Sequence, residues 1–251
     1  MRQTQDHFSG VAQNYASFRP TYPPQLAADL VAMAGGPTAV VYDMAAGSGQ
    51  ATLDLATVAQ TVFASDMAIK QIAALPVHPR IHPLVARAEA SAVADQSIDL
   101  VTVAQAMHWF DVPAFQHEVR RILRPQGIVA VWSYALLSGT PAVTAIINDL
   151  YHETGPWWPA DRRHVDNHYA ELPFEFTRIA YTPPAMTAAF TLPRLLGYLS
   201  TWSGVQRYQK DQQRDPVAER QAAFVAAWHG ATQEPMTFAF DLTVLVGRVS
   251  A

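Results

Sequence analysis

Cysteine is absent from this chain, and charged residues are scarce. Without cysteine there is no disulfide, no thiolate metal site and no cysteine nucleophile. Charged residues make up 15% of the 251 residues and the formal net charge is -4, which gives no sign of a nucleic-acid-binding surface. Because 50% of the residues are hydrophobic, the composition favours a compact core with an apolar pocket over a disordered chain.

Long apolar runs are also missing. The longest, near residues 128–137, is interrupted by Ser133 and is too short to span a bilayer. Residues 1–7 are polar and lack the apolar core of a signal peptide. We therefore expect a cytoplasmic protein that binds no membrane. Since no repeat, linker or low-complexity segment is found, we expect one domain over residues 1–251.

Strand-like and helix-like segments alternate over the first half of the chain, which predicts βαβ units and a parallel sheet. In such a sheet a ligand binds beyond the carboxyl ends of the strands. Those ends carry Asp43, Asp66, Glu89 and residues 105–109. The expected strands are 40–43, 61–66, 81–86, 98–103 and 128–132, and the expected helices are 24–33, 50–59, 68–75 and 113–123.

The second half has a different pattern. Helices are expected at 138–151, 192–210 and 216–228, and strands at 174–181, 186–190 and 236–249. In the last strand alternate residues are apolar, which predicts an antiparallel sheet edge. The helices are expected to form two cover insertions, at about 134–172 and 192–230.

Small residues dominate the turn at 45–49, which reads Ala-Ala-Gly-Ser-Gly. Backbone there can approach a ligand closely, and the N–H groups that begin the next helix face the same space. A dinucleotide fingerprint needs a third glycine after Gly47 and Gly49, but Thr52 stands in that place. This difference argues against an NAD(P)-dependent oxidoreductase, but it does not exclude that alternative.

Residues 43–49 (Asp-Met-Ala-Ala-Gly-Ser-Gly) resemble the first motif, acid-x-Gly-x-Gly-x-Gly, of class I S-adenosylmethionine-dependent methyltransferases. Residues 105–110 (Gln-Ala-Met-His-Trp-Phe), 155–159 (Gly-Pro-Trp-Trp-Pro) and 15–23 resemble blocks of their trans-aconitate methyltransferase-like branch, methyltransferase type 11. The resemblance covers nearly the whole chain. It implies a Rossmann-like α/β fold with a mostly parallel seven-stranded sheet, helices on both faces and an antiparallel last strand.

The resemblance also implies where the cofactor S-adenosylmethionine binds. Asp66 would accept hydrogen bonds from both ribose hydroxyls, although a strand-end acid is also an ordinary helix cap. Asp43 would hold the loop or the methionine amine. The backbone of Gly47 and Gly49 would approach the cofactor, and Ala45 replaces the usual first glycine, which is tolerable only at negative φ.

Ala88 would lie on the face of the adenine ring, Met67 would pack on it, and Glu89 would accept a hydrogen bond from its amino group, whereas a solvated acid and a core methionine are the ordinary interpretations. Residues 1–24, with Tyr15 and Arg19, would form an N-terminal lid in which the Arg19 fork takes the methionine carboxylate. A surface ion pair is the alternative for Arg19.

His108 and Trp109 are the candidate catalytic residues, and Gln105 is a candidate for cofactor binding. A histidine can act as a general base near neutral pH, but these residues can equally shape the pocket. A carboxylate acceptor needs no base, because its nucleophilic oxygen is already ionised. Methyl transfer then depends on proximity and in-line orientation.

His164 and His168 stand four residues apart, yet the motif lacks the glutamate of a zinc-binding helix, so no metal is expected. Arg162, Arg163 or Arg207 can bind an acidic acceptor, although each can also be a surface arginine. We predict a methyltransferase acting on a small molecule, for instance by O-methylation of a carboxylic acid. The alternatives are the oxidoreductase and a non-catalytic methyltransferase-like binding protein, and the protein is expected as a monomer or homodimer.

Overall fold

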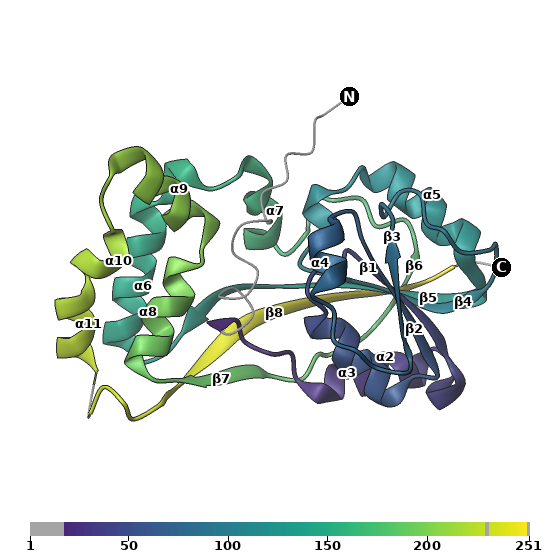
Figure 1. The fold of residues 1–251 in the computed structure, drawn as a ribbon, viewed down its shortest axis with the longest axis horizontal. Helices are drawn as coiled ribbons and strands as arrows, with labels where there is room; N and C mark the ends of the chain where they lie inside the picture. Colours follow the sequence, from purple (N-terminus) through teal and green to yellow (C-terminus); the bar gives the residue numbers. More distant parts are fainter. Residues whose placement is uncertain (1–17, 229–230, 250–251) are drawn as a thin grey trace.

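A computed structural model describes residues 18–228 and 231–249, which form an eight-stranded sheet flanked by helices (Figure 1). Seven strands lie side by side in the order β3-β2-β1-β4-β5-β8-β6, and β7 pairs with the other part of β8. The strands are β1 (Val40–Met44), β2 (Thr61–Asp66), β3 (Ile81–Val85), β4 (Ile98–Ala104), β5 (Leu123–Ser138), β6 (Thr177–Ile179), β7 (Met186–Phe190) and β8 (Met236–Arg248).

The first five strands of the chain are parallel, and β8 is antiparallel to β5. This arrangement confirms the predicted Rossmann-like sheet with its antiparallel last strand. The helices are α2 (Pro24–Met33), α3 (Gln50–Val58), α4 (Ile69–Ala73), α5 (Val112–Ile122), α6 (Pro141–Glu153), α7 (Arg163–Asp166), α8 (Leu192–Ser200), α9 (Ser203–Gln212), α10 (Pro216–Glu219) and α11 (Gln221–Ala227).

Two apolar clusters cover the two faces of the sheet. Alternate residues of one strand point to opposite faces, so Val41 belongs to one cluster and Tyr42 to the other. Leu30 of α2 and Leu55 of α3 pack in the first cluster, whereas Phe115 of α5 packs in the second. Helices therefore cover both faces, as predicted.

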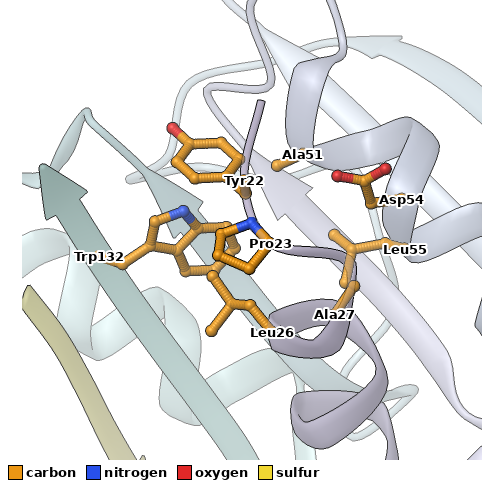
Figure 2. A pocket seen from close by; sticks show the side chains of 8 residues that line it. All are labelled: Tyr22, Pro23, Leu26, Ala27, Ala51, Asp54, Leu55 and Trp132. Atoms are coloured by element: carbon orange, nitrogen blue, oxygen red, sulfur yellow. The ribbon is translucent and has the colours of Figure 1, made fainter. Parts of the chain in front are cut away.

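The contact between α2, α3 and β5 is tightly packed. Figure 2 shows Trp132 of β5 on one side and Leu55 of α3 on the other, with Tyr22 and Leu26 between them. The rings of Tyr22 and Trp132 meet edge to face at 5.6 Å between centroids. The space left is about 10 Å³, which is no more than one water needs, so it is a packing gap and no ligand site.

Several predicted elements differ in extent from the structure. The strand expected at 128–132 is the longer β5, because β8 supplies partners as far as the pair Ser138 and Ala239. The helix expected from 138 therefore begins only at Pro141. The strand expected at 174–181 is reduced to β6, which pairs only with the last residues of β8.

The helix expected at 192–210 is interrupted between α8 and α9. Near the break, the hydroxyl of Thr201 donates to the carbonyl of Tyr198 at 2.6 Å and the hydroxyl of Ser200 donates to Leu196. Side chains that bond nearby carbonyls offer the backbone an alternative to continuing the helix. The helix expected at 216–228 is likewise divided, at Arg220, into α10 and α11.

The helices α6 and α8–α11 stand apart from those that cover the parallel strands. Figure 1 shows β5 and β8 running from the parallel sheet to this second group. The long antiparallel pair of β5 and β8 therefore joins the parallel sheet to this second group of helices. The carboxyl ends of the parallel strands face the region between these two parts.

Candidate functional site

A cleft of about 1630 Å³ opens at the carboxyl edge of the parallel strands. Its lining includes ten of the residues singled out from the sequence: Arg19, Ala45, Gly47, Asp66, Met67, Ala88, Glu89, Gln105, His108 and Trp109. Asp43 and Gly49 are buried behind this lining. Tyr15 and most of the expected N-terminal lid lie outside the described residues.

The turn after β1 lies in the left-handed region of backbone space. The φ angles are 54° at Ala45, 56° at Gly47 and 89° at Gly49. At Gly49 a Cβ would lie 2.8 Å from the side chains of Leu75 and Pro76, so only glycine fits there. At Gly47 a Cβ would meet nothing within 4 Å, so this backbone faces open space. Ala45, with φ 54°, is in the left-handed conformation that strains an alanine.

Asp66 joins two loops at the floor of the cleft. One carboxylate oxygen, Oδ2, accepts the N–H of Gly47 at 3.1 Å, and Oδ1 accepts the N–H of Ala68 at 2.8 Å. The second contact closes a turn just before α4, whose N-cap is Ala68 and has no side-chain cap, so Asp66 is not the helix cap of the alternative interpretation. The first contact fixes the glycine turn against the end of β2.

Asp43 is fully buried beneath the turn and connects three elements. Thr52 of α3 donates to Oδ2 at 2.6 Å, and Thr102 of β4 donates to Oδ1 at 2.8 Å. Burial raises the pKa of Asp43 to about 6, although both hydroxyls oppose this rise. Thr52, which stands in place of the third glycine of a dinucleotide fingerprint, therefore binds the carboxylate of Asp43.

Glu89 lies at the far wall, where it accepts the N–H of Asp111 at 3.1 Å and pairs with Arg87 at 3.4 Å. The loop that follows it is fastened to α5 by two residues that the sequence analysis did not single out. Glu118 accepts the N–H of Ser91 at 2.7 Å, and Arg121 pairs with Glu118 at 2.6 Å. Their spacing, i and i+3 on an amphipathic helix, was the available signal.

Arg19 and Gln105 both contact Tyr134 of β5. The Arg19 guanidinium donates to the hydroxyl of Tyr134 at 3.2 Å and lies 5.6 Å from the ring centroid of Tyr198. Gln105 has φ 57°, and its side-chain amide donates to the carbonyl of Tyr134 at 3.2 Å. This amide is therefore directed toward β5.

His108 lies between two aromatic rings. Its Nδ1 is 3.2 Å from the hydroxyl of Tyr169, and its ring is 4.6 Å from that of Trp109. Burial, helped by the nearby Arg162 and His164, lowers the pKa of His108 to about 3. The imidazole is therefore neutral at physiological pH, and it is too weak a base to take a proton from an alcohol or amine.

Arg162 lines the cleft, and two neighbouring side chains hold its guanidinium in place. Its Nε pairs with Asp166 at 3.1 Å, and its guanidinium lies 5.1 Å from the ring of Trp158. Arg207 and Lys210 of α9 also line the cleft and form no ion pair with any described residue. Arg163 is outside the lining, 70% exposed, and 4.0 Å from Glu171.

The histidine pair at 164 and 168 is separated by its contacts. His164 faces Glu171 at 3.9 Å, and His168 contacts the hydroxyl of Thr243 at 2.7 Å. Within residues 18–228 and 231–249 there is no group of three side chains suited to a metal ion. In the same ranges, no helix is long and apolar enough to cross a membrane.

Comparison with known proteins agrees with this geometry. A family model described as a methyltransferase domain matches residues 42–131. The solved structure of a protein named as a type II methyltransferase from Anaeromyxobacter dehalogenans is 36% identical, with a TM-score of 0.87 over 93% of this chain and 99% of that one. A relative from Dictyostelium discoideum, also named as a methyltransferase, is 29% identical over 89% of this chain and 86% of its own length.

Proposed function

Because this chain belongs to the class I methyltransferase family, we propose that it transfers the methyl group of S-adenosylmethionine to a small-molecule acceptor bound in the cleft. The observation that carries the proposal is the meeting of the glycine turn and the strand-end acid Asp66 at one edge of the cleft. The NAD(P)-dependent alternative lacks comparable support, since Thr52 in place of the third glycine is committed to Asp43.

The residues at this edge fit such a cofactor. Open space faces the backbone of Gly47, and the carboxylate of Asp66 is suited to hold two hydroxyl groups. Met67 is 52% exposed beside it, so it offers an apolar surface to a flat ring, with Ala88 and Glu89 on the same wall. When bound, the cofactor supplies an electrophilic methyl group on a positively charged sulfur.

The acceptor would occupy the other half of the cleft, where aromatic rings and cations gather. Trp158, Trp202 and Tyr198 provide apolar walls, and Arg162, Arg207 and Lys210 provide positive charge. Arg162 has its Nε bound to Asp166 and its flat face against Trp158, which supports binding of an anion by its remaining nitrogens. We therefore favour a carboxylic acid as the acceptor.

Cofactor binding is tested by thermal unfolding with S-adenosylmethionine, S-adenosylhomocysteine or NAD. Both sulfur compounds should stabilise the fold, by about 2.7 kcal/mol at a concentration of 100 Kd, and NAD should not. Asp66→Ala should abolish the shift. Asp99→Ala is the matched control, because Asp99 also accepts a backbone N–H, that of Val40, but at the amino edge of the sheet. A shift with NAD alone would refute the proposal.

Acceptor binding is tested by labelled methyl transfer to trans-aconitate, cinnamate, benzoate and the corresponding amides. Arg162→Gln should raise KM for a carboxylic acid about 10-fold or more, as expected for a lost charge-assisted hydrogen bond. Arg163→Gln removes the same charge from the neighbouring position, outside the cleft, and should leave KM unchanged. Equal effects of the two substitutions would contradict an anion site at Arg162.

A further inference from the structure

We propose that His108 acts as a neutral hydrogen-bond donor to the acceptor through Nε2, that Tyr169 is the positioning residue that fixes this state, and that the acceptor is already an anion when it binds. This inference rests on the proposed methyl transfer and deepens it. It assigns a substrate class from the protonation state of one ring, and it replaces the predicted general base with a donor.

The contacts of Tyr169 determine which ring nitrogen carries the proton. Its hydroxyl is 3.2 Å from Nδ1 of His108, and the side chain of Ser133 hydrogen-bonds the same hydroxyl. Ser133 is 1% exposed, and its side chain opposes the rise that burial causes in the pKa of Tyr169, which is the effect of a hydroxyl that donates to the phenol oxygen. The single proton of Tyr169 is then donated to Nδ1. An imidazole that accepts at Nδ1 carries its own proton on Nε2.

The other ring nitrogen is directed to the ligand. His108 lines the cleft, and its Nε2 has no partner within the described part of the chain. The charged and titratable groups that act on the ring are Arg162 and His164, and both disfavour a positive charge on it. The ring therefore stays neutral, with one N–H available to an oxygen of the acceptor.

Besides His108, the groups of the cleft lining that can act as a base are its four acids, Asp66, Glu89, Asp111 and Asp161. His108 is the one histidine among the described lining residues. Asp66 and Glu89 accept backbone N–H groups, and Asp111 caps α5 by accepting the N–H of Ala114. An alcohol or amine would need its proton removed, whereas a carboxylate would not. Arg162, beside His108, supplies the countercharge for such an anion.

The step then balances without a proton. A lone pair of the acceptor carboxylate forms the new bond to the methyl carbon, and the electron pair of the breaking carbon–sulfur bond remains on sulfur. The negative carboxylate becomes a neutral ester, and the positive charge of the sulfonium is lost. The N–H of His108 and the Arg162 guanidinium hold the carboxylate in line during this step.

The backbone around Tyr169 supports a positioning role. His168 and Tyr169 are consecutive left-handed residues, with φ 58° and 59°. This conformation costs roughly 1–2 kcal/mol for each non-glycine residue. Such strain persists where the surrounding structure requires a particular side-chain position. Here it directs the buried hydroxyl of Tyr169 toward His108.

Three substitutions of His108 separate a donor from a base. In His108→Gln the side-chain amide replaces Nε2–H as a donor but cannot act as a base, so kcat/KM for a carboxylic acid of the panel should stay within about threefold. His108→Ala and His108→Asn should lower kcat/KM about 10- to 100-fold, as expected for a lost hydrogen bond to a charged group. If His108→Gln is as inactive as His108→Ala, the proposal is wrong.

Tyr169→Phe keeps the ring and removes the bond to Nδ1. It should lower kcat/KM in the native background but have no further effect in His108→Gln, because the amide has no tautomer to fix. Equal losses in both backgrounds would indicate a structural role only. Nitrogen NMR of His108 should show Nε2–H and no titration between pH 5 and 8, and a proton on Nδ1 would overturn the assignment.

The failure of this inference is distinguishable from failure of the proposed function. The NMR measurement needs no substrate, and it can be made on the full chain with S-adenosylhomocysteine bound. An unchanged stabilisation by S-adenosylhomocysteine in every variant shows that the cofactor site is intact. Transfer to amides, alcohols or amines in place of carboxylic acids would refute the anionic acceptor while leaving methyl transfer itself established.

Discussion

Replacing Ala45 by glycine should stabilise the protein, although it removes a methyl group from a partly buried site. Ala45 has φ 54° in the turn between β1 and α3. In that region the Cβ of an L-residue lies too close to the following carbonyl oxygen, whereas glycine adopts the conformation freely. The strain at this position is therefore a property of the alanine and not of the turn.

The size of the effect follows from two opposing terms. Relief of the left-handed conformation contributes about 1–2 kcal/mol. The greater freedom of glycine in the unfolded chain costs about 0.4–1 kcal/mol. At the midpoints of the two ranges, the net stabilisation is about 0.8 kcal/mol. For a chain of this length, a gain of that size corresponds to a rise in Tm of roughly 1–4 °C.

Ala46→Gly is the matched control, because Ala46 is the next residue, is also partly buried and also lines the cleft, but has no positive φ. It should lose about 0.4–1 kcal/mol from unfolded-state entropy alone. Urea unfolding of both variants gives the two free energies, with the native chain as reference. Destabilisation of equal size in both would refute the strain argument.

Two further predictions concern pH. Hydrogen bonds from Arg121 and Ser91 hold the pKa of Glu118 at about 2. The contribution of Glu118 to the free energy of unfolding is therefore complete above its unfolded pKa and is lost as the pH falls toward 2. In urea unfolding, Glu118→Gln should cost about 2 kcal/mol at pH 7 and less at pH 3. The pKa of Asp43 is raised to about 6, so its contribution is complete below pH 4 and is lost as the pH rises through 6. Asp43→Asn should remove this dependence, which unfolding at pH 4 and pH 7 would detect.

Local signals were sufficient for the elements that begin and end within one stretch of sequence. The helix predicted at 24–33 is α2, with Pro24 at its first position and a left-handed Gly35 just beyond its end. The strand predicted at 61–66 is β2 without change. The convergence of strand-end residues was also predictable, because parallel strands bring their carboxyl ends to one edge.

Pairing between distant segments was not predictable from such signals. The length of β5 is set by β8, which lies about a hundred residues further along the chain. The partners of Asp43 show the same limit, since Thr52 is 9 residues away and Thr102 is 59 residues away. Tyr169 is 61 residues from His108 and carried no motif, so nothing near either residue predicted their contact.

The positions of backbone strain provide a last argument about the site. Ala45 follows β1 and Gln105 follows β4, neighbouring strands of the sheet, and both residues have φ near 55°. Each lines the cleft, and each turns the chain sharply where a ligand would approach the strand ends. Gln105 is held in this state by bonds to the carbonyls of Trp132 and Tyr134 in β5. The turn after β1 is held from β2, where Ser65 accepts the N–H of Ala46 and Asp66 accepts the N–H of Gly47. Because protein groups alone hold both turns, the backbone of the cleft floor has this shape without a ligand.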